Sequence, residues 1–480
     1  MSVHEECGVF GVMAPEHCDL AGIVYYGLYA LQHRGQESCG IVINDGGEFS
    51  SHKDLGLVGE VFSQKVLSSF PQGNIAVGHV RYGTTGATNR SNCQPIEVNH
   101  QRGKMALAHN GNLSNAFELR RQLELNGAIF HTTTDTETIA YIVTKERLSS
   151  DSIEEAVSRA MDIIDGAYSL IIMSPHKLIC ARDPYGFRPL CYGVTSDGTY
   201  IAASESPALT AVGAKFVRNI EPGEIVIFTE NGVSSRREHC GKKQKRLCSF
   251  EYIYFARPDA VIDGVSVHSA RLRAGRILAK HHPAVADIVI GVPDSGLDAA
   301  LGFSQASGIP YGIGLIKNKY IGRTFISPGQ SSRLDKVKIK LSAIEESVSG
   351  RRVVLVDDSI VRGTTSGRIV GLLREAGARE IHMRISSPPF LNPCYYGTDI
   401  DSRDNLIACH HTVDEIAEII GADTLGYLPV DTLSEMIGGH EYCSACFDGR
   451  YPTEIPKDTR KDRFESKLSD KNKTEHCSND

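Results

Sequence analysis

The chain has 480 residues, which is more than a single hydrophobic core usually supports, so the length predicts two domains. A net charge of -7, with 41% hydrophobic and 23% charged residues, is typical of a soluble globular protein and argues against a nucleic-acid partner or an anionic membrane surface. The N-terminus has no signal-peptide core, and no apolar run approaches the ~20 residues that span a bilayer, so we expect a cytoplasmic protein without membrane contact.

Short apolar or alternating runs in the first half predict β-strands, with turn-forming Gly, Asn and Asp between them. The candidates are Cys7–Val12, Ile75–Val80, Met105–Ala108, Ser169–Ile172 and Tyr200–Ala203. One helix is expected from near Ser114 to Gly127, and a second begins at Thr134, where Thr134 and Glu137 have the spacing of a capping box. This mixture predicts stacked sheets with helices outside.

Continuous apolar runs in the second half predict parallel strands that are buried on both faces. They are Asp287–Val292, Val353–Val356, Ile381–Ile385 and Thr424–Val430. Helical segments lie between them, such as Ser366–Ala376 with Gly377 as a stop, and this alternation predicts an α/β domain. The charged stretch Arg236–Arg246 marks the boundary between the halves, and residues 460–480 are expected to form a flexible charged tail.

A buried strand, an acid pair, a Gly/Thr/Ser loop and a helix follow one another between Val353 and Gly367. Ligands of open α/β sheets bind at the carboxyl ends of strands. The backbone N–H groups of Gly363–Ser366 suit a phosphate dianion, while Asp357 and Asp358 suit ribose hydroxyls and Mg²⁺. A lone acid pair would indicate a solvated turn, but the ordered set favours a phosphate site.

This stretch resembles the phosphoribosyl pyrophosphate signature of type I phosphoribosyltransferases. Gly291–Gly296 resembles the pyrophosphate loop of that family and Lys317–Phe325 its mobile basic lid, although each alone could be an ordinary loop. The resemblance implies a parallel-sheet domain that binds phosphoribosyl pyrophosphate. The residues it assigns to that substrate are Lys317, Asp357, Asp358, Ser359, Arg362, Gly363, Thr364 and Thr365. Those it assigns to Mg²⁺ are Ser295, Asp357 and Asp358.

Four motifs follow Cys7 in a fixed order along the first half. They are Gln32–Ser38, Gly78–Thr84, Ala108–Leu113 and Thr133–Glu137. A single cysteine near an N-terminus is usually a buried thiol, but the ordered set resembles the N-terminal-nucleophile glutamine amidotransferases over residues 7 to about 230. The resemblance implies an αββα sandwich, followed here by the parallel-sheet domain of a type I phosphoribosyltransferase.

Amide hydrolysis needs a nucleophile, a base and an oxyanion hole. The nucleophile would be the Cys7 thiolate and the base its own α-amine; such an amine has a pKa of about 8. By resemblance, Asn110 and Gly111 stabilise the oxyanion, and the residues that bind glutamine are Arg81, Thr84 and Asp135. The alternatives are that Arg81 forms a structural ion pair and that Asp135 is a first-turn helix acid.

The α-amine of Cys7 lies inside a peptide bond in the translated chain, because six residues precede it. Residues 1–6 are therefore expected to be a propeptide that self-processing removes. His33, His79 and His109 are interpreted as scaffold residues, since the amine can act as the base.

Four of the thirteen cysteines have contexts that suggest a metal site. Cys443 and Cys446 form a C-x-x-C pair, which alone is weak evidence. Together with Cys248 and Cys394 they resemble the iron–sulfur subgroup of amidophosphoribosyltransferases, in which the matching thiolates hold one [4Fe–4S] cluster per subunit. Four thiolates also suit zinc, so only the resemblance favours iron.

The combination of the two domains resembles the amidophosphoribosyltransferase family over nearly the whole length, with residues 7–237 as the amidotransferase domain and residues 238–459 as the phosphoribosyltransferase domain. The implied reaction converts glutamine, phosphoribosyl pyrophosphate and water to phosphoribosylamine, pyrophosphate and glutamate, the first step of purine synthesis. The family also implies purine nucleotide inhibitors, a homotetramer and a closed path for ammonia.

Two alternatives are weighed against this hypothesis. One is another glutamine amidotransferase, such as a glucosamine-phosphate or asparagine synthetase, which would lack the loop Asp357–Thr365. The other is a regulatory nucleotide-binding protein without turnover, which would not need Cys7, Arg81, Asn110 and Asp135 together.

Overall fold

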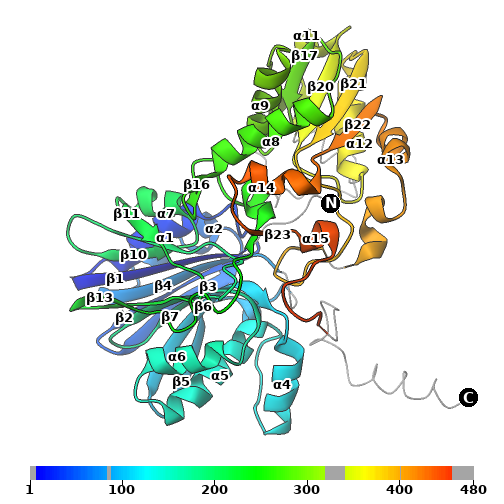
Figure 1. Cartoon of the computed structure of the whole chain (residues 1–480). Coiled ribbons are helices and arrows are strands. Elements are labelled where there is room, and N and C mark those ends of the chain that lie inside the picture. Colours follow the sequence, from blue (N-terminus) through cyan, green and yellow to red (C-terminus); the bar gives the residue numbers. More distant parts are fainter. Residues whose placement is uncertain (1–6, 84–87, 319–340, 401, 457–480) are drawn as a thin grey trace, which may run out of the picture.

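The computed structural model describes residues 7–83, 88–318, 341–400 and 402–456 (Figure 1). The predicted propeptide at residues 1–6, the predicted tail at residues 460–480, Thr84, and the lid beyond residue 318 lie outside the described residues. In the described ranges, no helix is long and apolar enough to cross a membrane.

The first half of the chain folds as two stacked antiparallel sheets (Figure 1). The strand order of the first sheet is β11 (Lys215–Asn219), β9 (Cys191–Val194), β10 (Tyr200–Ala203), β1 (Gly8–Cys18), β4 (Gly73–Arg81), β2 (Ser38–Asp45) and β3 (Glu48–Leu55). That of the second sheet is β13 (Gly232–Arg236), β12 (Ile225–Thr229), β8 (Leu178–Arg182), β7 (Gly166–Met173), β6 (Gly103–Leu113) and β5 (Ile96–His100).

Helices cover the outer faces of both sheets, so the first half has four layers in the order α, β, β, α. The helices on the first sheet are α1 (Leu20–Ala30) and α7 (Ser206–Ala211), and those on the second are α5 (Asp135–Ser149) and α6 (Ile153–Met161). Alternation along β1 supplies both interfaces of the first sheet: Phe10 and Val12 share a core with α1, whereas Val9 and Met13 share one with the second sheet.

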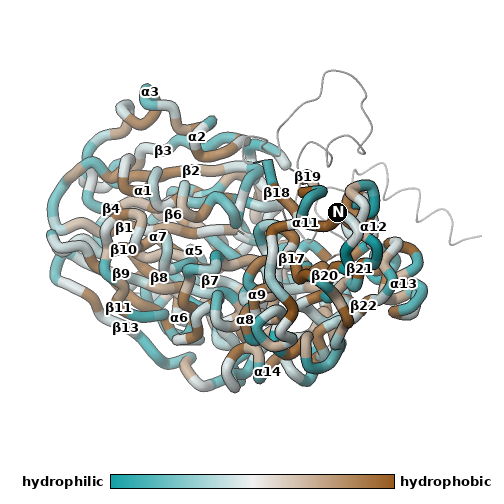
Figure 2. Tube along the Cα trace, turned by 90° about the horizontal axis from the view of Figure 1, so that it is seen from above, coloured by the Kyte–Doolittle hydropathy of each residue, from teal (hydrophilic) through white to brown (hydrophobic). Residues whose placement is uncertain are grey.

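A parallel sheet forms the centre of the second half. Its strands follow chain order: β17 (Ile288–Gly291), β20 (Arg352–Asp357), β21 (Glu380–Ile385) and β22 (Thr424–Tyr427). One face packs on α8 (Val267–His281), α9 (Leu297–Ser307) and α14 (Leu433–Met436), and the other on α11 (Glu345–Val348), α12 (Thr364–Glu375) and α13 (Val413–Ile420). In Figure 2 the chain is apolar at β17 and β20 and more polar on α12, as a sheet covered on both faces requires.

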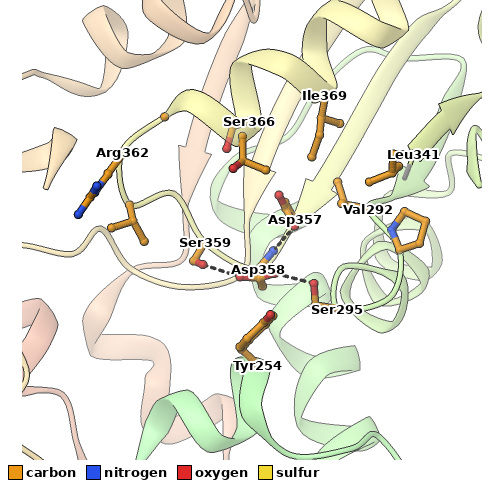
Figure 3. Close-up of a pocket in the computed structure, with 14 residues that line it drawn as sticks. Tyr254, Val292, Ser295, Leu341, Asp357, Asp358, Ser359, Arg362, Ser366 and Ile369 are labelled. Carbon is orange, nitrogen blue, oxygen red and sulfur yellow. Dashed lines mark hydrogen bonds between the residues drawn. The ribbon is translucent and has the colours of Figure 1, made fainter. Parts of the chain in front are cut away.

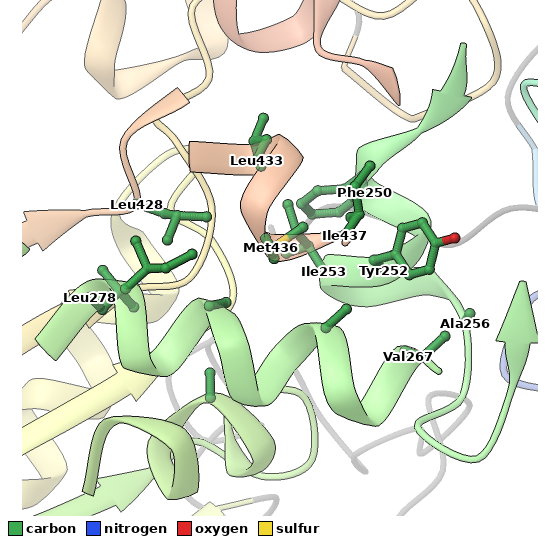
Figure 4. Packing of buried hydrophobic residues seen from close by; sticks show 14 of the residues in the cluster. Phe250, Tyr252, Ile253, Ala256, Val267, Leu278, Leu428, Leu433, Met436 and Ile437 are labelled. Carbon is green, nitrogen blue, oxygen red and sulfur yellow. The ribbon is translucent and has the colours of Figure 1, made fainter. Parts of the chain in front are cut away.

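A π-helical turn, η2 (Glu251–Phe255), connects the two halves. Phe250 and Ile253 lie against Met436 and Ile437 beside α8, in the apolar cluster of Figure 4. The same cluster reaches Val289 and Val354 of the sheet. The core of the second half therefore begins directly after the charged boundary, and it includes the segment that enters from the first half.

The remaining helices and strands complete the described chain. In the first half these are α2 (Val58–Val61), α3 (Gln64–Leu67), η1 (Arg90–Asn92) and α4 (Ala116–Leu125). In the second half they are β14 (Leu247–Cys248), β15 (Val261–Ile262), β16 (Val265–Ser266), β18 (Leu315–Lys317), β19 (Leu341–Ala343), η3 (Arg403–Asn405), η4 (Ile407–Cys409), η5 (Val430–Thr432), β23 (Tyr442–Cys443) and α15 (Ala445–Asp448).

Two local predictions, one at α5 and one at β22, are wrong in detail. Thr134 is the N-cap of α5 as predicted, but its side chain makes no capping hydrogen bond. The Glu137 carboxylate instead accepts from the backbone N–H groups of His131 and Thr132, which pulls the preceding loop onto the helix. The strand predicted to end at Val430 ends at Tyr427, because Pro429 leads into a 3-10 turn.

Candidate active site

A pocket lies at the carboxyl ends of β17 and β20, where the polar loops that follow these two strands meet (Figure 3). The predicted substrate and metal residues that line it are Ser295, Asp357, Asp358, Ser359, Arg362, Gly363 and Thr365. Thr364 is exposed and does not line the pocket. Tyr254, which the sequence did not single out, lines the pocket from η2.

The acid pair at the end of β20 is almost fully buried. The backbone N–H of Asp358 donates to Asp357 Oδ1 at 2.9 Å, and the hydroxyl of Ser295 donates to Asp358 Oδ2 at 2.5 Å. The Ser359 hydroxyl donates to the other oxygen of Asp358. Burial, together with the charge of Asp358, raises the pKa of Asp357 well above its usual value, and burial also raises that of Asp358. A divalent cation would relieve both effects, so the pair fits a Mg²⁺ site.

The N-terminus of α12 opens onto the same pocket. Gly363 is the N-cap with φ +79°, a left-handed conformation that favours glycine, and a Cβ there would lie 2.8 Å from Ile407 Cδ1. The helix starts at Thr364, two residues earlier than predicted, so Thr364 and Thr365 belong to its first turn. Backbone N–H groups in the first turn of a helix have no acceptor within the helix, so this helix end and the pocket beside it suit a phosphate.

The predicted basic lid is described only at its start. Lys317 ends β18, is exposed, and forms an ion pair with Asp294 at 2.7 Å. Asp294 precedes Ser295 in the predicted pyrophosphate loop, so this contact places Lys317 beside the pocket without lining it.

Cys7 lies at the start of the first sheet, directly before β1. Its side chain is buried, its Sγ donates to the backbone carbonyl of Tyr82 at 3.5 Å, and its own carbonyl accepts from Arg34 Nε at 3.1 Å. Because Gly8 pairs with Val80 on β4, the thiol lies beside the strand end that carries Arg81.

Asn110 and Gly111 lie near the end of β6 in the second sheet. The Asn110 side chain is fully buried, and neither its nitrogen nor its oxygen has a hydrogen-bond partner among the described residues. Gly111 has φ +142°, and a Cβ there would lie 2.2 Å from the carbonyl oxygen of Ala167. A buried amide without a partner is costly unless a ligand satisfies it, so Asn110 fits an oxyanion donor.

The predicted glutamine-binding charges are both nearly buried. Arg81 lies 3.7 Å from Glu37, a loose ion pair, and Asp135 Oδ2 accepts from the backbone N–H of Leu113 at 2.9 Å. The second oxygen of Asp135 lies 3.6 Å from His109 Nδ1. Both predicted residues thus also have structural partners, and the Leu113 contact holds Asp135 beside β6.

The three histidines have scaffold partners. Nε2 of His79 pairs with the carbonyl of His109 at 3.0 Å, which joins the two sheets, and burial lowers the pKa of His79 to about 3. His109 contacts Thr136 Oγ1 and the Ala167 carbonyl, while His33 pairs with Glu205 at 2.8 Å.

Comparison with known proteins identifies the family. The glutamine amidotransferase domain family matches residues 79–211. A curated amidophosphoribosyltransferase from Methanocaldococcus jannaschii is 48% identical over 94% of this chain and 98% of its own length. One from Bacillus subtilis is 49% identical over 95% of this chain and 96% of its own length. The chain belongs to the amidophosphoribosyltransferase family. A solved member, the B. subtilis glutamine phosphoribosylpyrophosphate amidotransferase complexed with ADP and GMP, superimposes with a TM-score of 0.88 at 48% identity, covering 95% of this chain and 99% of that one. The predicted two-domain fold class is confirmed.

This member of the amidophosphoribosyltransferase family has a buried ion network between its halves that the sequence did not reveal. Arg34 Nη1 donates to Glu205 at 2.6 Å, and Arg34 Nη2 donates to Glu251 at 2.7 Å. Arg188 lies 3.4 Å from Glu251, and all four side chains are fully buried. Arg34 belongs to the motif Gln32–Ser38, but no local pattern in the sequence indicates that Glu251, 217 residues away, is its partner.

The four cysteines of the predicted iron–sulfur site gather in the second half. Cys248 on β14 pairs in register with Cys443 on β23. Cys394 and Cys446 pack against the apolar cluster that contains Cys248. Burial raises the pKa of Cys446 well above its usual value, and the nearby thiols of Cys394, Cys248 and Cys443 add to the shift. In the described part of the chain, no group of three or more His, Cys, Asp or Glu side chains is spaced to hold a single metal ion.

Proposed function

We propose that the chain transfers ammonia from glutamine to phosphoribosyl pyrophosphate, releasing glutamate and pyrophosphate and forming phosphoribosylamine, the first step of purine synthesis. The observation that carries this proposal is the pocket where the buried pair Asp357 and Asp358 meets the N-terminus of α12. A glucosamine-phosphate or asparagine synthetase would lack the loop Asp357–Thr365 that lines this pocket. Full-length similarity to curated amidophosphoribosyltransferases agrees with the proposal.

In the glutamine half, the α-amine of Cys7 would take the thiol proton and the thiolate would attack the side-chain amide. The Asn110 amide and the Gly111 N–H would stabilise the oxyanion, after which ammonia leaves and water hydrolyses the thioester to glutamate. Arg81 and Thr84 would hold the α-carboxylate and Asp135 the ammonium group. Burial of Arg81 and Asp135 supports these roles, because charges held out of water bind opposite charges strongly.

In the ribose half, ammonia would attack the anomeric carbon and the bond to pyrophosphate would break. Asp357 and Asp358 would hold the ribose hydroxyls and, with Ser295, would bind Mg²⁺. The metal would supply positive charge to offset that of the pyrophosphate. Mg²⁺ sites commonly use one or two carboxylates with substrate oxygens, so two acids suffice. Ser359, Arg362, Gly363, Thr364 and Thr365 would hold the 5-phosphate, and Lys317 would approach the pyrophosphate.

The amine mechanism requires that residues 1–6 be removed. Mass spectrometry of the N-terminus of active protein should find Cys7 first. Active enzyme that retains Met1 would rule out the α-amine as base.

The four cysteines are proposed to hold one [4Fe–4S] cluster per subunit, which places the chain in the iron–sulfur subgroup. Their convergence supports this, and a cluster is larger than one ion, so its thiolates stand farther apart than those of a mononuclear site. The cluster would join β14 to β23 and stabilise the fold. Anaerobically purified protein should contain four irons per chain and absorb visible light, and colourless protein with one zinc per chain would refute the cluster.

Purine nucleotides are proposed as inhibitors, because the solved B. subtilis relative was complexed with ADP and GMP. The family resemblance also supports a homotetramer, which sedimentation velocity would test.

The proposed reaction is tested by measuring glutamate release with and without phosphoribosyl pyrophosphate. Release that this substrate stimulates is expected for the wild type and not for Asp358→Asn, because the variant lacks one ligand of the ribose hydroxyls and Mg²⁺. Binding of phosphoribosyl pyrophosphate without glutamate release would support a regulatory protein instead.

A further inference from the structure

The strand that carries the oxyanion residues is held from the second half of the chain. Asn112 lies two residues after Asn110 on β6 and is 8% exposed. Its Nδ2 donates to the backbone carbonyl of Tyr395 at 2.9 Å, across 283 positions of sequence. The side chain thus connects the glutamine half to a turn of the phosphoribosyltransferase half.

The next two residues of that turn contact the same region. The carbonyl of Tyr396 accepts from Arg188 Nε at 3.2 Å and Nη2 at 2.7 Å, and the ring of Tyr396 stacks on Phe187 with centroids 4.1 Å apart. Gly397 has φ +119°, and a Cβ there would lie 3.5 Å from the carbonyl carbon of Gly111. Three consecutive residues of the turn therefore rest against the oxyanion strand or the arginine beside it.

The contacts from the turn matter because the side chain of Asn110 forms no hydrogen bond with the described residues that would orient it. The direction of its amide depends on the backbone of β6. Pairing with β7 holds one edge of that backbone, with Asn110 opposite Ser169. Past Gly111, the hydrogen bond from Asn112 to the turn adds a second anchor. An oxyanion donor that is displaced by about half an ångström loses much of its effect.

We propose that the turn Cys394–Gly397 is a positioning element of the glutamine site and that Asn112 is the residue through which it acts. The inference rests on the proposed oxyanion role of Asn110 and Gly111. It adds that the orientation of the oxyanion donors in the glutamine half depends on contacts from the second half of the chain.

The test uses two substitutions at Asn112 in the full-length enzyme. Asn112→Ala removes the donor, and Asn112→Asp keeps the size but turns a carboxylate oxygen toward the Tyr395 carbonyl. The kcat for glutamine hydrolysis should fall about tenfold in Asn112→Ala and further in Asn112→Asp, less than the roughly 100- to 1000-fold expected when an oxyanion donor is removed. The KM for glutamine, the ammonia-dependent rate and the rate of Cys7 alkylation by iodoacetamide should stay at wild-type values.

Asn115→Ala is the matched control, because Asn115 Nδ2 donates to the Ile163 carbonyl at 2.9 Å within the first half. It should leave all four quantities unchanged. The inference is overturned if both Asn112 variants keep wild-type kcat, or if they lose the glutamine and ammonia rates together, which would indicate a general structural defect.

Asn110→Ala separates this inference from the proposed function. If Asn110→Ala loses hydrolysis while the Asn112 variants keep it, the oxyanion assignment stands and only the positioning role fails. If Asn110→Ala hydrolyses glutamine at the wild-type rate, the oxyanion assignment fails and the positioning role fails with it.

Discussion

Asp357 is buried at a cost to the fold, and it is one of the residues proposed to bind the ribose hydroxyls and Mg²⁺. Its carboxylate is buried at a strand end, where burial and the neighbouring Asp358 raise its pKa. A carboxyl group with a raised folded-state pKa favours the folded protein at low pH, and that contribution is lost as the pH rises through the folded-state pKa. At neutral pH, Asp357 and Asp358 therefore lower the stability of the folded, metal-free protein.

Asp357→Asn should accordingly raise the melting temperature of metal-free protein at pH 7.5, and the gain should shrink as the pH falls toward 4. Synthesis of phosphoribosylamine should fall with both nitrogen sources. Asp287→Asn is the control, and its effect on the melting temperature should have the opposite sign, because hydrogen bonds from Arg352 lower the pKa of the exposed Asp287. Calorimetry across pH measures both, and a lower melting temperature of Asp357→Asn at pH 7.5 would contradict the account.

At the scale of elements, the periodicity of the sequence predicted all four strands of the parallel sheet but only five strands of the two stacked sheets, β1, β4, β6, β7 and β10. Buried strands with continuous or alternating apolar residues are the ones that such a pattern reveals. It predicted helix ends less well. The start of α12 was placed at Ser366, but Gly363 turns the backbone early and the helix begins at Thr364. At α5 the spacing of Thr134 and Glu137 indicated a capping box, but Glu137 has donors nearby in space that the pattern does not encode.

The N-terminus of α12 gives the second prediction. Gly363→Ala should lower the free energy of unfolding by about 1–2 kcal/mol, because alanine is strained at positive φ, and should raise the KM for phosphoribosyl pyrophosphate. Gly371→Ala in the same helix has open space around the new Cβ and should stabilise by about 0.5–1 kcal/mol without changing the KM. Urea denaturation and steady-state kinetics provide the measurements. Equal effects of the two substitutions would show that the conformation of Gly363 is unimportant.

For the whole molecule, the residues that join the halves were the least predictable. Arg34 and Glu251 are 217 positions apart. Arg34 lies in the motif Gln32–Ser38, but the motif does not reveal a partner that Arg34 contacts only where the two halves meet. The same is true of Asn112 and Tyr395. Cys7, Asn110, Asp357 and Asp358 are predicted as site residues because the motifs around them resemble known families. Such motifs carry no information about contacts between distant segments.

The buried network predicts strong coupling of the two halves in unfolding. Glu251→Ala should cost about 3–5 kcal/mol, because it leaves Arg34 and Arg188 as buried charges short of one partner. Glu48→Ala, which breaks the surface pair with Lys104, should cost at most about 1 kcal/mol. Denaturant titration measures both values. A loss below that of Glu48→Ala would contradict the role given to the network.

In the proposed function, one chain makes ammonia at Cys7 and uses it at the Asp357–Asp358 pocket. The most direct measurement compares phosphoribosylamine synthesis by wild type and Cys7→Ala, with glutamine and with ammonium salts as nitrogen sources. Cys7→Ala should lose synthesis from glutamine and keep synthesis from ammonia near the wild-type rate. Glutamine-dependent synthesis by Cys7→Ala, or loss of both routes together, would contradict it.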